Sequence, residues 1–174
     1  MGFGSGPKRE SVPRTGFKGF TGFKGFTGFK GFTGFTGFTG FGRGSCLPGD
    51  LGARKVEDLV AWQLAYQLQR EVLAFTAVEP AASDRKFCDQ VRDSARSAAR
   101  NTAEVFGRFS PREFARFLRI AAGSLLETTH HLRDARDCGY LIAGEEERLR
   151  RLALRALKAN IRLQQYLRRC NQRS

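Results

Sequence analysis

The sequence predicts an all-α protein: an up-down-up-down antiparallel four-helix bundle that follows a disordered, Gly/Phe-rich N-terminal tail. Residues 1–49 hold 15 of the 20 glycines and 10 of the 16 phenylalanines, so this part differs in composition from the rest. Residues 50–174 contain four long segments in which apolar residues recur every three or four positions, the spacing of one helix face. Only a few residues separate these segments, which favours antiparallel neighbours and one bundle domain over residues 50–174.

The N-terminal segment, residues 1–49, is predicted to be a disordered low-complexity tail. From Gly16 to Phe41 it repeats Gly-Phe-Thr or Gly-Phe-Lys with a period of three, which matches neither a strand nor a helix. Two interpretations stay open. The tail is either a cationic segment whose Phe rings and lysines stack on bases or self-associate, or a translated DNA duplication upstream of the true start.

The first helix is expected from about Lys55 to Val78. Its predicted apolar stripe consists of Val56, Leu59, Val60, Ala65, Leu68, Val72 and Phe75. Pro80 and Ser83 mark its end and the next start. The second helix is expected from about Ser83 to Phe106, closed by Gly107, and its predicted apolar face consists of Phe87, Val91, Ala95, Ala98, Thr102 and Phe106.

The third helix has the clearest start, Ser110-Pro111-Arg112-Glu113. Ser110 can cap the Glu113 amide, and proline suits the first helical position, where no amide donor is needed. Gly139 is expected to end this helix in the left-handed conformation. The fourth helix is expected from about Ala143 to Cys170, with three glutamates in its first turn, where the helix dipole favours acids.

The fourth helix has more apolar surface than one core needs. Its apolar residues spread over about 180° of the helical wheel, against about 100° for a helix that packs on a single core. These residues are Leu149, Leu152, Ala153, Ala156, Leu157, Ile161, Leu163 and Leu167. The surplus predicts self-association into a homo-oligomer.

A polar row runs beside the apolar face of the second helix, and two residues of the third helix have matching character. The predicted polar network consists of Gln90, Ser97, Asn101, Glu104, Ser124 and Glu127. Two interpretations stay open. The row is either a hydrogen-bonded network that fixes register within the bundle or between subunits, or the lining of a polar groove or central pore.

Basic residues are also ordered along the helices. The formal charge of +13 comes from both parts, since residues 1–49 hold seven Lys/Arg and one acid, and residues 50–174 hold 23 and 16. Such a charge favours polyanionic partners, and arginine suits phosphate. The candidate nucleic-acid-binding residues are Arg92, Arg96, Arg100, Arg112, Arg116, Arg119, Arg148, Arg151, Arg155, Lys158, Arg162 and Arg169. The alternative is a solvated charged face.

Other functional classes lack their residues. Glu127-x-x-His130 matches one unit of a di-iron bundle, but the only other histidine is the adjacent His131, so neither a metal site nor another cofactor is expected. No Cys or Ser has a His and acid arrangement for nucleophilic catalysis, and we expect no enzyme. The four dispersed cysteines and the lack of a signal or membrane-spanning segment predict a cytoplasmic protein with reduced thiols.

Several separated motifs resemble a known family. These are residues 56–63, the run from Gln90 through 101–108, Ser110 to Phe114, residues 117–127, and Cys138-Gly139-Tyr140-Leu141. In this order they resemble the 23S rRNA intervening-sequence protein family of four-helix bundles, related to the accessory protein of diversity-generating retroelements. The resemblance spans roughly residues 55–168. It differs at Ala98 and Ala99, where the family usually has Ile and Pro, and at Val105, where it has Gly.

The resemblance implies a bacterial protein that assembles as a homopentamer. In the related branch, the accessory protein has a reverse transcriptase and nucleic acid as its partners. Our first hypothesis is therefore a non-catalytic homo-oligomer that binds structured RNA or DNA through basic helix faces. The alternative is a protein-protein adaptor, such as an accessory subunit of a reverse transcriptase, that uses the Gln90 to Glu104 face.

Overall fold

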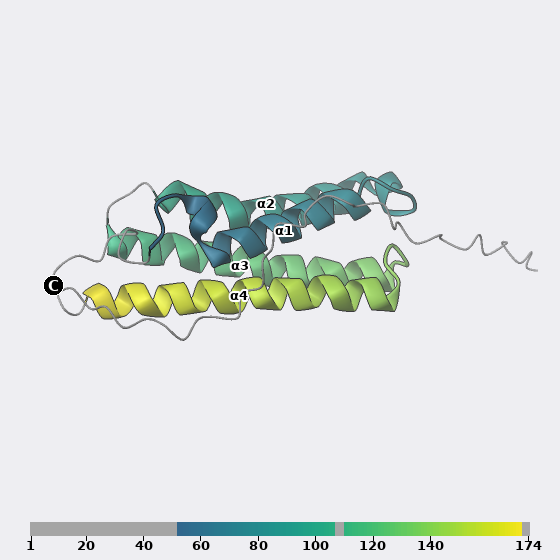
Figure 1. Cartoon of the computed structure of the whole chain (residues 1–174). Coiled ribbons are helices and arrows are strands. Elements are labelled where there is room, and N and C mark those ends of the chain that lie inside the picture. Colours follow the sequence, from purple (N-terminus) through teal and green to yellow (C-terminus); the bar gives the residue numbers. More distant parts are fainter. Residues whose placement is uncertain (1–51, 107–109, 172–174) are drawn as a thin grey trace, which may run out of the picture. The chain divides into compact units, whose positions relative to one another are not determined.

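A computed structural model describes residues 52–106 and 110–171 of the chain (Figure 1). The four long helices are α1 (Val60–Phe75), α2 (Arg85–Phe106), α3 (Pro111–Asp137) and α4 (Ala143–Asn171). Two short 3-10 helices, η2 (Val56–Asp58) and η3 (Ala81–Ser83), precede α1 and α2. The predicted all-α four-helix bundle is confirmed, whereas the Gly-Phe tail and Gly107 lie outside the described residues.

The helices pack side by side along their lengths, and α1 and α3 each lie against both α2 and α4 (Figure 1). The side-chain amide of Gln164 in α4 donates to the backbone oxygen of Leu118 in α3 at 3.3 Å, which fixes the register of that pair. The buried core forms two clusters, of which the larger runs from one end of the bundle to its middle and the smaller lies towards the other end. The larger cluster includes Leu68, Val91 and Leu132, and the smaller one includes Phe114 and Leu167.

The first helix begins later than the sequence predicts. The Asp58 carboxylate accepts the backbone amides of Arg54 and Lys55 at 2.9 and 3.1 Å, which holds η2 as a separate turn. Leu59 then takes an extended conformation, with φ of −78° and ψ of 116°, and α1 starts only at Val60. Within α1 the predicted Ala65, Leu68 and Val72 are buried, but Val60 is 45% exposed, so its predicted place in the apolar stripe is wrong.

The predicted caps of the later helices are present. Ser110 accepts the Glu113 amide at 3.4 Å at the start of α3, and Gly139 ends that helix with φ of +77°. The second helix starts at Arg85 instead of Ser83, because the Asp84 carboxylate caps it by accepting the Phe87 amide at 3.0 Å. Local sequence therefore sets three helix ends through named side-chain or glycine contacts.

Alanines on α2 allow close packing in the middle of the bundle. Ala95, Ala98 and Ala99 are at most 4% exposed and belong to the larger core cluster. Ala98 and Ala99 lie near the middle of α2. Two alanines at this place keep α2 unbroken through its centre, because neither removes a backbone donor as proline would.

Candidate nucleic-acid interface and polar network

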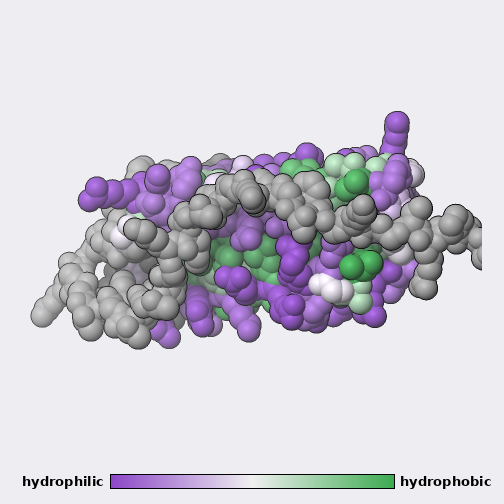
Figure 2. Space-filling model, turned by 45° about the vertical axis from the view of Figure 1, so that its right-hand side comes forward, coloured by the Kyte–Doolittle hydropathy of each residue, from purple (hydrophilic) through white to green (hydrophobic). Residues whose placement is uncertain are grey.

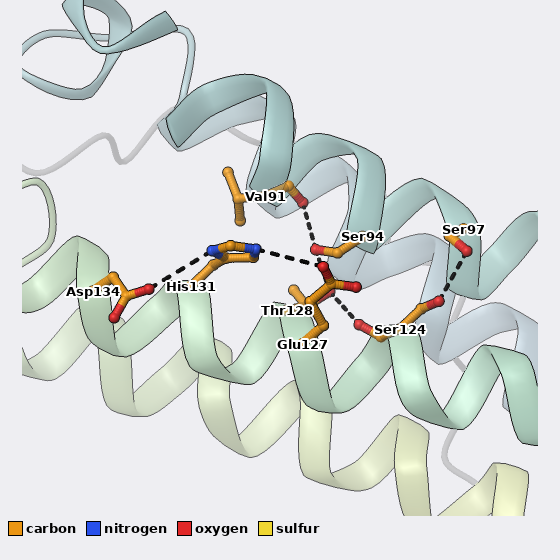
Figure 3. A network of polar contacts seen from close by, with 8 residues as sticks. All are labelled: Val91, Ser94, Ser97, Ser124, Glu127, Thr128, His131 and Asp134. Atoms are coloured by element: carbon orange, nitrogen blue, oxygen red, sulfur yellow. Dashed lines mark hydrogen bonds and ion pairs between the residues drawn. The ribbon is translucent and has the colours of Figure 1, made fainter. Parts of the chain in front are cut away.

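Hydroxyl groups join α2 to α3 along the predicted polar row (Figure 3). Ser97 and Ser124 share a hydrogen bond of 2.8 Å, and Ser94 and Thr128 share a second one of 3.0 Å. Asn101 donates to the backbone and side-chain oxygens of Ser97 at 2.8 and 3.0 Å. Two predicted residues, Ser97 and Ser124, thus meet directly. The predicted network does not include Thr128, whose hydroxyl takes part in the second contact.

Gln90 and Glu127, which also belong to the predicted network, are not partners in these hydroxyl contacts. They lie at an open, shallow hollow of about 350 Å³ between α2 and α3. The hollow is lined by Gln90, Asp93, Ser94, Ser97, Arg100 and Glu127. Two acids and one base share this lining, so the hollow lacks the excess of positive charge that would favour phosphate.

His131 lies close to this network, on α3 (Figure 3). Its Nδ1 is 3.7 Å from Asp134, and its Nε2 is 3.9 Å from Glu127 and buried without a hydrogen-bond partner. Its ring meets the Phe87 ring edge-on, with centroids 6.3 Å apart. Within residues 52–106 and 110–171, no three His, Cys, Asp or Glu side chains are grouped so that they could hold a metal ion.

Arg92 differs from the other candidate phosphate-binding residues. It is half-buried, and its guanidinium donates to the Thr76 hydroxyl at 2.8 Å and to the Thr76 backbone oxygen at 2.7 Å. Thr76 is fully buried and caps the C-terminal end of α1. The Arg92 side chain is therefore engaged in joining α2 to the end of α1.

The basic row of α4 divides into paired and unpaired residues. Arg148 forms an ion pair with Glu71 of α1 at 3.0 Å, and Arg151 pairs with Glu147 at 3.6 Å. Arg150 also binds Glu147, and this hydrogen bond lowers the pKa of the Glu147 carboxyl. The rest of the row is exposed and takes part in none of the ion pairs among the described residues. These are Arg155, Lys158, Arg162 and Arg169.

The net charge is strongly positive at one end of the bundle only. Because the helices alternate in direction, the first halves of α1 and α3 lie beside the second halves of α2 and α4, as the smaller core cluster also requires. At this end, residues 52–67, 96–106, 110–123 and 157–171 hold eleven Lys/Arg and four Asp/Glu. The opposite end, residues 68–95 and 124–156, holds ten and eleven. The exposed Arg112, Arg116 and Arg119 of α3 belong to the positive end.

Apolar side chains are exposed along the seam between α3 and α4. Leu126 is 51% exposed and Ile161 is 41% exposed, with the half-buried Leu157 on the same side of α4. The contact of Gln164 with Leu118 sets the antiparallel register, and 1.5 Å per residue then brings Leu126 to the level of Leu157. On the side drawn in Figure 2, green apolar surface also breaks the purple hydrophilic surface at mid-length and towards one end.

Sequence reasoning missed an aromatic pair at the positive end. The rings of Trp62 and Tyr66 are stacked with centroids 4.9 Å apart and planes 7° from parallel. Tyr66 is 41% exposed, whereas Trp62 is half-buried against the smaller core cluster. The spacing i, i+4 on a predicted helix was the available signal, since such residues are neighbours on one face.

The fold and this surface define a class: an antiparallel four-helix bundle with an internal hydroxyl network and a strongly basic end. Within this class, the 23S rRNA-intervening sequence protein family matches residues 57–161, which is more than half of the chain. The chain belongs to this family, as its motifs predict. Comparison with curated proteins finds no match.

None of the helices in the described ranges combines the length and the apolar character that crossing a membrane would require.

Proposed function

We propose that this protein is a non-catalytic binding protein that holds structured RNA or DNA by its phosphates, at the basic end of the bundle. The observation that carries the proposal is the distribution of unpaired cations. Lys158, Arg162 and Arg169 on α4 and Arg112, Arg116 and Arg119 on α3 are exposed, and none belongs to an ion pair among the described residues. Cations that do not bind protein carboxylates are available to phosphate at no loss of an existing pair.

The small number of acids at this end of the bundle also favours the proposal over a merely solvated charged face. A charged face that serves solubility needs no separation of charge, and mixed signs serve it as well. Here the two ends of the bundle hold similar numbers of Lys/Arg, and only the number of acids differs, four against eleven. The low acid content of one end supports attraction of a polyanion to that end.

Affinity as a function of salt tests this function. Binding of a labelled structured RNA and a DNA duplex is measured by fluorescence anisotropy at several salt concentrations. Because bound cations release condensed counterions, we expect affinity to fall steeply between about 50 and 200 mM salt. Absence of binding to both ligands at low salt would overturn the proposal.

We also propose that the protein is a homo-oligomer, with a pentamer the stoichiometry that the family resemblance implies. The exposed Leu126 and Ile161 support self-association, because exposed apolar side chains, such as these along the seam between α3 and α4, often form subunit contacts. The same side chains favour the second candidate function, a protein-protein adaptor such as an accessory subunit of a reverse transcriptase. A partner protein that copurifies in a fixed ratio after nuclease and high-salt washing would favour the adaptor. For either function we expect the protein in the cytoplasm.

A further inference from the structure

We infer that the stacked pair Trp62 and Tyr66 is a binding site for unpaired nucleobases, so that the basic end of the bundle takes single-stranded nucleic acid. This inference rests on the proposed function, and it adds to it the strandedness of the ligand and the residues that distinguish single strands from duplexes.

The geometry of the pair suits base stacking. Its rings are nearly parallel and separated by 4.9 Å between centroids, so the Tyr66 ring already stacks on the Trp62 ring at this face of α1. Tyr66 is the outer member and exposes 41% of its surface, whereas Trp62 is held from beneath by the smaller core cluster. A rigid, partly exposed aromatic surface provides a π-face to which any base can add at little entropic cost.

Cations lie on both sides of the pair along the bundle axis. Arg54 and Lys55 precede η2 and are exposed, eight and seven residues before Trp62. On α2, the contact of Arg92 with Thr76 sets the antiparallel register, and 1.5 Å per residue then puts Arg100 about 3 Å from the level of Tyr66. Arg96 lies one turn further along.

Arg96 is free to bind phosphate, whereas Arg100 also lines the hollow between α2 and α3 together with Asp93 and Glu127. Both are exposed, and neither belongs to an ion pair or a side-chain hydrogen bond among the described residues. An aromatic stack beside exposed cations is the arrangement of single-strand binding surfaces, in which bases stack on rings and the backbone follows the positive charge. A duplex presents its phosphates to the same cations, but its bases are stacked on one another and do not reach Tyr66.

The chain carries its own reporter of this contact, because Trp62 is the only tryptophan. The experiment titrates the full chain with an oligouridine and with an RNA duplex of equal length, and records both Trp62 fluorescence and anisotropy of the labelled RNA. We expect the single strand to quench Trp62 in proportion to binding and the duplex to bind without quenching. In Tyr66→Leu, affinity for the single strand should fall about tenfold, within the range measured for loss of one base-aromatic stack, and duplex affinity should not change.

Tyr66→Phe is the matched control, since it keeps the aromatic face and loses only the hydroxyl; it should bind the single strand like the original protein. Circular dichroism verifies that both variants are folded. Single-strand binding without quenching, and with unchanged affinity in Tyr66→Leu, would overturn the base-stacking site while leaving phosphate binding by the basic end intact. Failure of both RNAs to bind would overturn this inference and the proposed function together.

Discussion

Arg92 closes the C-terminal end of α1, because its guanidinium binds both the hydroxyl and the backbone oxygen of Thr76, at 2.8 and 2.7 Å. The last carbonyls of a helix have no partner within the helix, and that of Thr76 is buried, away from water. A residue that the sequence assigns to phosphate binding therefore satisfies a buried acceptor of its own fold. Equal spacing along α2 does not give its arginines equal roles.

Replacement of Arg92 by Met should destabilise the protein. Met keeps most of the apolar stem but leaves the Thr76 hydroxyl oxygen without its donor and the Thr76 backbone oxygen with only the weak Cys88 thiol at 3.6 Å, so we expect the free energy of unfolding to fall by about 2 kcal/mol. Urea denaturation measures the change. Arg96→Met, which removes an exposed arginine from the same helix, is the matched control and should change stability by less than about 0.5 kcal/mol. Equal stability of the two variants would contradict the capping role of Arg92.

Two triple variants of α4 test the basic end with equal losses of charge. Alanine at Lys158, Arg162 and Arg169 removes unpaired cations, and we expect affinity for RNA to fall at least about tenfold at low salt. The slope of log affinity against log salt should lose about three units if each cation contacts one phosphate. Anisotropy titration measures both quantities.

The matched triple is Arg148, Arg150 and Arg151 to alanine, which removes three cations that pair with Glu71, Glu146 and Glu147. It should weaken RNA binding much less, because these cations lie at the opposite end among carboxylates. If both triples lower affinity equally, net charge alone governs binding and the basic end has no special role.

The hydroxyl contacts between α2 and α3 should show energetic coupling. Ser94→Ala and Thr128→Val each remove one partner of the 3.0 Å bond, and we expect each to cost about 1 kcal/mol of unfolding free energy. The double variant removes both partners, so its cost should be smaller than the sum by about 0.5 kcal/mol or more. A double-mutant cycle from urea denaturation gives this value, and strict additivity would show that the two hydroxyls do not interact.

Charges on the exposed apolar seam should prevent self-association. Lysine at Leu126 and at Ile161 would put two desolvated cations into a subunit contact, whereas both positions are exposed within one bundle and should tolerate lysine. Sedimentation velocity should show a smaller species for the double variant than for the original chain, with unchanged helix content. An original chain that sediments as a monomer at micromolar concentration, or a variant with the same oligomeric state, would exclude this seam as the contact.

Acid should weaken the fold partly through Asp84. Its carboxylate accepts the Phe87 amide at 3.0 Å and the Tyr140 hydroxyl at 2.9 Å, and these bonds lower the pKa of Asp84. As the pH falls, Asp84 is therefore protonated at a higher pH in the unfolded chain than in the folded protein. The contribution of Asp84 to the free energy of unfolding is complete above its pKa in the unfolded chain, near 3.9, and is lost as the pH falls through its lower pKa in the folded protein.

Asp84→Asn has no such proton to bind, so its urea midpoint should decline less between pH 6 and pH 2.5 than that of the original chain. The remaining decline comes from other carboxyls whose pKa is lowered, such as Asp58 and Glu147. Identical decline in both proteins would show that Asp84 does not contribute to acid sensitivity.

The sequence by itself determined what depends on neighbours along the chain. Apolar spacing predicts four helices, the Ser110 cap and Gly139 fix ends of α3, and separated motifs in order predict the family. These features were predictable because helix hydrogen bonds and caps span at most a few residues. The boundary at Leu59 was missed because the Asp58 carboxylate, which binds two earlier amides, competes with the helical periodicity.

Only the tertiary structure decided which charged residues are available. Arg92 is engaged by Thr76 and Arg148 by Glu71, and each partner is distant in sequence. The basic end exists because alternating helix directions bring together the acid-poor halves of α2, α3 and α4. One helix alone cannot reveal such a surface, since the charge on it depends on which residues of other helices lie alongside.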